Sequence, residues 1–208
     1  MYNYTEILRE AEGYNFDKVK EMLRQNIREE GARSAGRQGQ QKIIDRLMKD
    51  NKNGANKALT KAQAQDDGRF AFTDGKILFI CDTDFGYEVE TERAFKTDRL
   101  MQDVNANICD SATLDKAEIQ TFIKLAGLRR NGVKNKAYIV KTDKGQYMGY
   151  NPFYLIDFID FTGSAKILVD TPIRPAKSDV MDAIVLPANI REKAMNDENY
   201  QKWREENL

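Results

Sequence analysis

Histidine is absent from this chain of 208 residues. Its absence excludes Ser-His-Asp and Cys-His catalysis and removes the commonest zinc-binding side chain. The sequence also lacks the patterns GxxxxGKS/T, GxGxxG after a strand, GxSxG and HExxH, which mark common nucleotide-binding and hydrolytic sites. The remaining Lys, Asp, Glu, Tyr and Cys residues do not follow a spacing that would indicate a catalytic site. The sequence therefore predicts a protein that is not an enzyme and that uses no cofactor.

Cysteine and long apolar runs are scarce as well. Cys81 and Cys109 are the only cysteines, and neither belongs to a CxxC pair. Residues 1–12 contain acids where a signal peptide would have an apolar run, and sparse cysteine without such a peptide favours a reducing compartment. No stretch approaches the roughly 18 apolar residues that cross a bilayer. We expect a soluble, cytoplasmic protein with no membrane partner.

Charge is balanced over the whole chain but not along it. Acids and bases number 33 each, whereas between Lys18 and Lys61 twelve bases stand against five acids. A row of basic side chains on a helix can neutralise DNA phosphates without reading the base sequence. The candidate nucleic-acid contacts are Arg28, Arg33, Arg37, Lys42, Arg46 and Lys49. A solvated helix that pairs its charges at i,i+4, for example Asp45 with Lys49, is the open alternative.

The chain is predicted to have three parts: a helical, basic region at 1–64, an α+β domain at 65–190 and a polar tail helix at 191–208. In the first part, helices are expected at 3–12, 15–30, 41–50 and 55–64, with Asn15 as an N-cap and a loop at 31–39.

The α+β domain is predicted to pack short helices on antiparallel sheet. Turn clusters between β-rich runs indicate two hairpins. Helices are expected at 114–125 and at 151–161, the second with Asn151 as its cap and Pro152 at its first position. Strands are expected at 70–72, 77–81, 87–90, 137–140, 146–150, 165–169, near 173 and at 183–186. A helix followed by a hairpin occurs twice, which indicates internal repetition.

Two motifs of this domain resemble one known family. The segment from Tyr150 to Ile190 joins an Asn-Pro helix, an Ile-Arg-Pro strand region and a final strand that ends in Leu-Pro. This order resembles the last half-domain of bacterial DNA polymerase sliding clamps. The strand–Thr-Asp-Gly-Lys–strand element at 70–81 resembles a second clamp element. The resemblance covers about 68–190, and because a clamp subunit has three repeated domains, it implies a reduced and divergent clamp-like domain.

The resemblance also implies partners and a site. The partners would be double-stranded DNA and short peptides of replication and repair proteins, and several copies would be needed to close a ring. The implied peptide-pocket residues are Thr73, Gly75, Lys76, Ile77, Leu78, Ile184, Leu186 and Pro187. The open alternative is that the aliphatic residues among them are the core of paired strands. A phage or mobile-element origin would suit such a small version of the family.

Other functions remain open. The first alternative is a structural or interaction protein with no nucleic-acid role. The second is a metal-dependent nucleic-acid enzyme centred on Asp82 and Asp84, although no complete metal-binding pattern follows these residues. Asp157 and Asp160 lie one helical turn apart and are expected at the surface. A loop with four bases is a second candidate phosphate contact; they are Arg129, Arg130, Lys134 and Lys136.

Overall fold

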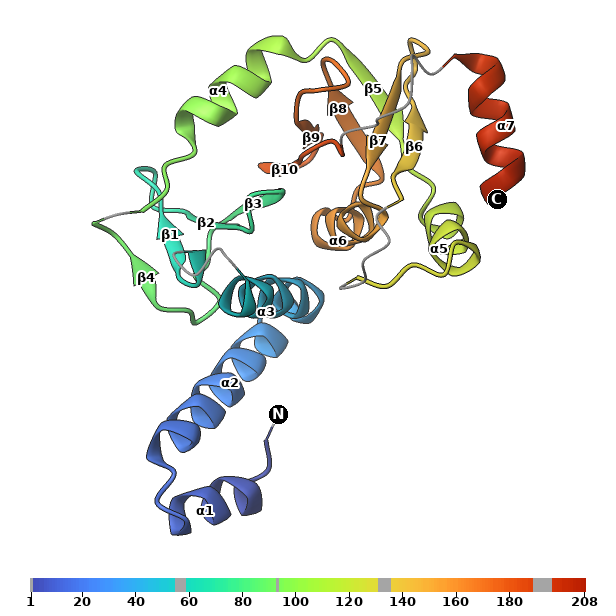
Figure 1. Cartoon of the computed structure of the whole chain (residues 1–208). Coiled ribbons are helices and arrows are strands. Elements are labelled where there is room, and N and C mark those ends of the chain that lie inside the picture. The colour runs from blue at the N-terminus through green and yellow to red at the C-terminus, as the bar shows by residue number, and fades with distance from the viewer. Residues whose placement is uncertain (1, 55–58, 93, 131–135, 189–195) are drawn as a thin grey trace. The chain divides into compact units, whose positions relative to one another are not determined.

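The computed structural model describes residues 2–54, 59–92, 94–130, 136–188 and 196–208 (Figure 1). They form two compact units. Unit 1 comprises Met1–Phe72 and Cys81–Phe95, and unit 2 comprises Thr73–Ile80 and Lys96–Leu208. The described elements are α-helices and short strands, so the predicted α+β class is confirmed. The predicted three-part division of the chain stays a prediction.

Unit 1 begins with three helices, α1 (Tyr4–Glu12), α2 (Phe16–Ser34) and α3 (Gln38–Asn53). Asn3 and Glu6 form a capping box: the Asn3 side chain accepts from Glu6 N at 2.8 Å, and the Glu6 carboxylate accepts from Asn3 N at 3.1 Å. Asn15 precedes α2 as predicted, but its side chain donates to Glu10 Oε2 instead of capping the helix. The loop predicted at 31–39 is shorter than expected because helix extends into it from both sides.

The strands of unit 1 are β1 (Ala62–Ala64), β2 (Phe70–Thr73) and β4 (Val89–Glu90). β1 pairs antiparallel with β2 and parallel with β4. The helix predicted at 55–64 is therefore wrong at 62–64, because pairing with two neighbours holds this stretch extended; residues 55–58 lie outside the described residues. Phe72 of β2 is buried and makes edge contacts with the rings of Phe85 and Tyr87.

The sheet of unit 2 has the strand order β3-β10-β9-β8-β5, and these neighbours pair antiparallel. Its strands are β3 (Ile77–Cys81), β5 (Asp110–Thr113), β8 (Lys166–Val169), β9 (Ala176–Ser178) and β10 (Ala183–Val185). The strand expected near Ile173 begins later, and Ile173 is 87% exposed beside a turn in which Arg174 N donates to Thr171 O. Pro175 explains the shift, because it has no N–H to donate to a neighbouring strand.

Two helices of unit 2, α5 (Lys116–Leu125) and α6 (Pro152–Thr162), pack against each other (Figure 1). Both were predicted. The stacked rings of Phe79 and Phe161, with centroids 4.0 Å apart, pack α6 on β3. The orders β5-α5-β6-β7 and β7-α6-β8-β9 repeat the same kinds of element. The helix α4 (Asp98–Asn107) precedes β5 and had no prediction.

The hairpin of β6 (Tyr138–Lys141) and β7 (Tyr147–Tyr150) was predicted, and the helix α7 (Asp197–Asn207) contacts it. Trp203 of α7 lies 5.5 Å from the ring of Phe122 and 5.7 Å from that of Tyr138. At the start of α7, hydrogen bonds from Lys141 and Tyr147 lower the pKa of Asp197. Within the described ranges, no helix is both long and apolar enough to cross a membrane.

Candidate functional site

The start of α6 is fixed by the residues that the sequence singles out. Asn151 lies just before the helix, and its side-chain oxygen accepts from Phe153 N at 3.0 Å. Pro152 occupies the first helical position, where a missing N–H removes no helical hydrogen bond. Gly163 ends the helix in a left-handed conformation with φ +70°. Both ends of α6 therefore have a local cause, and the side chains of its first turn are held in place.

The turn between β2 and β3 is held by its own side chains. Thr73 Oγ1 donates to Ile77 O at 2.7 Å and accepts from Gly75 N at 2.9 Å. Asp74 Oδ1 accepts from two backbone N–H groups of the same turn at 2.8 and 3.1 Å. Gly75 has φ +86°, which costs little without a Cβ. Tyr154 Oη donates to Asp74 Oδ2 at 2.7 Å, which ties the turn to α6.

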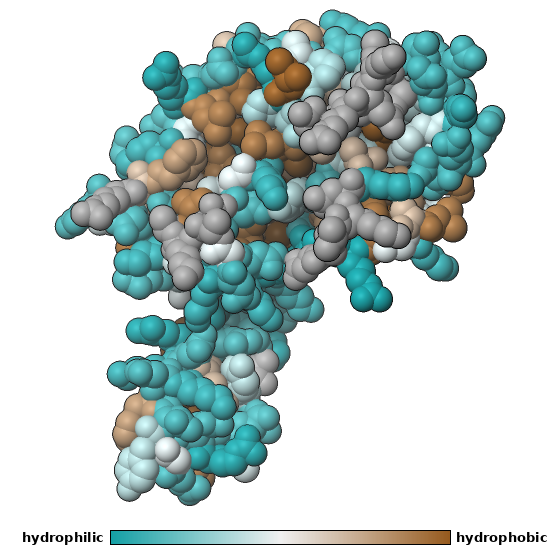
Figure 2. All heavy atoms as spheres, viewed as in Figure 1, coloured by the Kyte–Doolittle hydropathy of each residue, from teal (hydrophilic) through white to brown (hydrophobic). Residues whose placement is uncertain are grey.

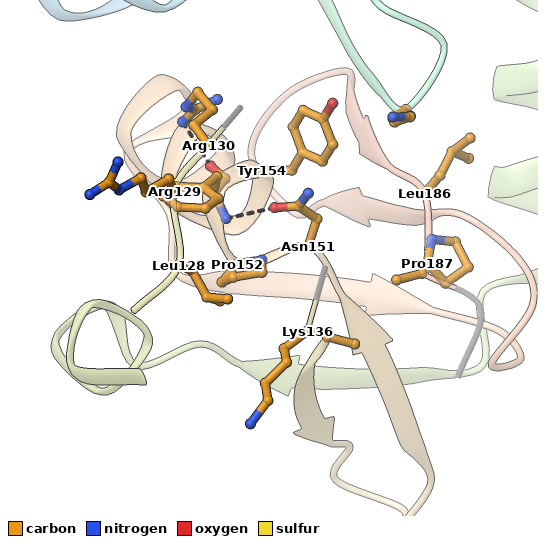
Figure 3. A pocket seen from close by; sticks show the side chains of 13 residues that line it. Leu128, Arg129, Arg130, Lys136, Asn151, Pro152, Tyr154, Leu186 and Pro187 are labelled. Atoms are coloured by element: carbon orange, nitrogen blue, oxygen red, sulfur yellow. Dashed lines mark hydrogen bonds between the residues drawn. The ribbon is translucent and has the colours of Figure 1, made fainter. Parts of the chain in front are cut away.

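A cavity of about 370 Å³ lies in unit 2 beside this turn and the start of α6 (Figure 3). We call it the α6 pocket. Its lining residues are Lys76, Leu128, Arg129, Arg130, Lys136, Ala137, Asn151, Pro152, Phe153, Tyr154, Leu186, Pro187 and Ala188. In Figure 3, Leu186 and Pro187 lie on the other side of the cavity from Leu128 and Pro152, so apolar groups line opposite walls. Leu186 N donates to Lys76 O at 2.8 Å, which holds the segment after β10 against the turn.

Three exposed cations stand at the rim of the α6 pocket: Lys76, Arg129 and Lys136. The charged ends of Arg129 and Lys136 extend away from Asn151 (Figure 3). A charged group that stays in water while its stem covers apolar surface adopts such an arrangement. In the part of the chain that the structure describes, none of the three forms an ion pair with a carboxylate. The rim is therefore positively charged.

The fourth cation, Arg130, is engaged within the pocket wall. Its Nη1 and Nη2 donate to the two carboxylate oxygens of Asp157 at 2.6 and 2.7 Å, and Nη2 also lies 3.3 Å from Phe153 O. The guanidinium carbon is 5.3 Å from the centroid of the Phe153 ring. Asp157 is 5% exposed, so the expectation of a surface residue is wrong. A distant loop supplies the cation that makes this burial tolerable.

The eight predicted pocket residues divide into three groups. Three of them line the α6 pocket: Lys76, Leu186 and Pro187. Ile77, Leu78 and Ile184 are each at most 4% exposed and lie in the paired strands β3 and β10, where Ile184 faces Leu78. These three are core residues of paired strands, whereas Leu186 follows β10 and is 37% exposed. Thr73 and Gly75 shape the turn that carries Lys76.

The predicted nucleic-acid contacts lie on or next to α2 and α3 of unit 1. Arg33, Lys42 and Lys49 are exposed, whereas Arg37 and Arg46 are half-buried. Lys42 and Lys49 are seven residues apart on α3, about two turns, so both side chains leave the same side of the helix. Lys52 of α3 is exposed as well and pairs with Glu21 at 3.6 Å, so Lys42 and Lys49 are the predicted contacts on α3 that are exposed.

The sixth predicted contact, Arg28, is engaged within unit 1. Its guanidinium lies 4.8 Å from the centroid of the Tyr87 ring, and its Nε is 3.9 Å from Asp45 Oδ1. Tyr87 Oη donates to the same Asp45 oxygen at 2.6 Å. Burial, together with this hydrogen bond to a carboxylate, raises the pKa of Tyr87. The Arg28 side chain is 15% exposed and supports the fold of unit 1.

The segment after β3 forms a turn. Asp84 Oδ1 accepts from Gly86 N at 2.8 Å, and Phe85 has φ +52°. Among the described residues, no group of three or more His, Cys, Asp or Glu could hold a metal ion. Both cysteines are free thiols, and burial raises the pKa of Cys81 to about 12. Cys109 is exposed.

Sequence reasoning missed part of the α6 pocket. Arg129, Arg130 and Lys136 were expected in a separate phosphate-binding loop, and the structure places them in the same cavity as Lys76; Lys134 lies outside the described residues. Leu128 and the first turn of α6 had no predicted role in binding. The Asn-Pro signal fixes where α6 starts, but no local pattern indicates which distant segments surround that start.

No family model matches the sequence, and no curated protein matches it significantly. The structure is similar to the DNA polymerase sliding clamp of Pseudomonas aeruginosa, with 13% identity and a TM-score of 0.38, over 59% of this chain and 55% of that chain. The DNA polymerase III beta chain of Streptococcus pneumoniae (16% identity, TM-score 0.36) and the sliding clamp of Bacillus subtilis (12%, 0.34) are similar over 59% of this chain and 41% of theirs. The chain thus spans 41 to 55% of these proteins. They belong to the family that the two sequence motifs resemble.

Proposed function

We propose that this protein is a non-enzymatic, clamp-like docking scaffold of the cytoplasm, whose α6 pocket receives a short linear peptide of a replication or repair protein. The observation that carries the proposal is the combination of apolar walls and a positively charged rim in one cavity of unit 2. Short peptides bind through a few anchor side chains in an apolar pocket, with polar groups around them. The α6 pocket has both parts.

The chemistry of the pocket defines the class of peptide. Leu128, Pro152, Leu186 and Pro187 offer apolar surface, which selects an aliphatic or aromatic anchor. The cavity of about 370 Å³ lies near the lower end of the range for ligand pockets, roughly 300–1,000 Å³, so it suits one or two side chains. The cationic rim favours a peptide with an acidic residue, or a terminal carboxylate, next to the anchor.

A selection experiment tests the proposal. A phage-displayed library of short random peptides is selected on the full chain, and the affinity of the enriched peptide is measured by fluorescence anisotropy. Leu186→Asp places a charge in the apolar wall and should weaken binding at least about 10-fold. Leu125→Asp is the matched control, because Leu125 is 61% exposed on α5 and is not among the lining residues. Equal affinity of both variants, or no enriched peptide, contradicts the proposal.

The charge of the rim gives a second test on the same peptide. Lys76→Glu should weaken binding and reduce its dependence on salt concentration, because one favourable charge at the rim becomes unfavourable. Lys166→Glu changes an exposed lysine of β8 and should leave the affinity within about 2-fold. If Lys76→Glu and Lys166→Glu weaken peptide binding equally, the peptide responds only to the net charge of the protein and the rim has no specific role.

Association with double-stranded DNA is the second candidate function. The exposed pair Lys42 and Lys49 on α3 favours it. DNA binding should weaken as the salt concentration rises, because each phosphate contact contributes roughly −0.9 to the slope of log K against log salt concentration. Replacing both lysines with Gln should make this slope less negative by roughly 1.8, which is the contribution of two phosphate contacts. If the protein binds neither DNA nor peptide, the interaction protein without a nucleic-acid role is the remaining interpretation.

A further inference from the structure

The helical hairpin of α1 and α2 carries large apolar side chains at its surface. Tyr4 and Leu8 of α1 are 86% and 58% exposed, and Phe16, Leu23 and Ile27 of α2 are 57%, 42% and 67% exposed. We call these five residues the hairpin face. Figure 2 shows apolar residues at the surface of the lower part of the view, among polar ones. A surface helix normally turns such residues inward, so their exposure in unit 1 requires an explanation.

Helix geometry places the hairpin face on one side. α1 and α2 run antiparallel, because Tyr2 pairs with Asn26 at one end of the contact while Glu10 pairs with Lys18 at the other. Ile7 of α1 and Met22 of α2 are buried, and Met22 lies on the same face of α2 as Lys18 and Asn26, which bond to Glu10 and Tyr2. Leu8 follows Ile7, and Leu23 follows Met22. Each of these two exposed residues therefore points about 100° around its helix axis from the contact between the helices. In an antiparallel pair, this same sense of rotation brings both exposed stripes to the same side.

We propose that the hairpin face binds the same face of a second copy of this chain, so that two hairpins form a four-helix interface. The proposal concerns unit 1 and does not depend on peptide binding by unit 2. With about 150–250 Å² of surface for a fully exposed aromatic side chain, the five residues expose on the order of 600 Å² per copy. A stable interface buries about 800 Å² per partner, and exposed apolar patches of several hundred Å² mark interaction sites.

The charges of the hairpin favour a second copy of the chain over a partner whose surface is uniformly charged, such as DNA or an anionic lipid surface. Residues 2–34, which span α1 and α2, contain six bases and seven acids, so the hairpin is close to neutral although the residues that follow it are basic. DNA and anionic lipid surfaces bind positively charged faces and are therefore disfavoured here. On α2 the exposed Lys20 and Glu30 follow the same helical spacing as Phe16, Leu23 and Ile27, so this stripe carries one charge of each sign. A twofold interface brings identical surfaces together, so a face with both charge signs is compatible with its own copy, whereas a partner of one charge sign would meet a like charge on it.

Sedimentation equilibrium of the full chain tests the proposal. The wild-type chain should form dimers in a concentration-dependent manner. Leu23→Glu combined with Ile27→Glu should raise the dissociation constant at least about 100-fold, because both copies then bury charges in an apolar interface. Leu23→Ala with Ile27→Ala should give an intermediate value. The control is Ile173→Glu, which changes a residue of unit 2 that is 87% exposed and should leave the constant unchanged.

The helix content of each variant, measured by circular dichroism, should match that of the wild type, because the substituted positions are exposed. A wild-type chain that remains monomeric at all concentrations overturns the proposal. A dimer that persists in the Glu double variant also overturns it, since another surface would then hold the copies together. Sedimentation of a monomeric wild type with phosphatidylglycerol vesicles, lost in the Glu variant, would assign the face to a lipid surface instead.

Discussion

The ion pair of Arg130 and Asp157 is expected to be the most sensitive polar contact of the α6 pocket. Arg130→Leu removes two hydrogen bonds of 2.6 and 2.7 Å from a carboxylate that is 5% exposed. Removing one partner of a buried ion pair costs about 3–5 kcal/mol, because the remaining charge stays desolvated. Since the Arg130 side chain is itself 23% exposed, we expect the lower end of this range, about 3 kcal/mol of unfolding free energy.

Substitution of the other partner of the ion pair should cost less unfolding free energy. Asp157→Asn keeps the shape of the side chain and one oxygen that accepts a hydrogen bond. The guanidinium of Arg130 then loses its counter-charge, but it is exposed enough to be hydrated, so we expect a loss of about 1 kcal/mol. The difference of about 2 kcal/mol between the two variants follows from the unequal burial of the partners. Arg129→Leu is the control, because Arg129 is exposed and should change stability by less than about 0.5 kcal/mol.

Urea unfolding measures these costs in unit 2. Trp203 is the only tryptophan of the sequence and packs against Phe122 and Tyr138 of unit 2, so its fluorescence reports on this unit. Arg130→Leu should lower the midpoint clearly more than Asp157→Asn does. Equal costs for the two variants, or a cost below about 1 kcal/mol for Arg130→Leu, would refute the account of a buried carboxylate held by its guanidinium.

Three further predictions concern other local features. Asn151→Ala removes the N-cap of α6 and should lower the unfolding free energy of unit 2 by about 1 kcal/mol in urea; no change would show that the cap does not hold the helix. Because the folded-state pKa of Asp197 is lowered, its contribution to holding α7 is present above the unfolded-state pKa, near 3.8, and is lost as the pH falls through the lower folded-state value. The tryptophan fluorescence should therefore change with pH below about 4, and Asp197→Asn should abolish that part of the change. Gly86→Ala should destabilise unit 1 more than Gly36→Ala in hydrogen exchange, because both have a positive φ but only the Cβ at Gly86 meets Arg28 Cγ, at 2.7 Å.

The elements that the sequence predicted well have local causes. The start of α6 follows from Asn151 and Pro152, whose cap and fixed φ act on the neighbouring residues alone. The turn before β3 follows from Asp74 and Gly75 in the same way. Such signals are complete within a few residues, so the sequence is enough to identify them.

The elements that it missed depend on distant partners. Residues 62–64 form β1 because β2 and β4 pair with it, although an alanine-rich stretch favours helix by itself. Asp157 of α6 is buried because Arg130 reaches it from the loop after α5. The α6 pocket likewise combines residues from separate stretches of unit 2, so its apolar walls and charged rim appear only when the fold is known.

The most direct test of the docking scaffold is a map of where the peptide binds. The selected peptide is titrated into the ¹⁵N-labelled full chain, and changes in backbone amide chemical shift are followed residue by residue. The largest changes are expected at Lys76, at Phe153 and Tyr154, and at Leu186, and Leu186→Asp should abolish them. Changes confined to the α1–α2 hairpin, or spread evenly over the chain, would contradict the assignment of the α6 pocket as the peptide site.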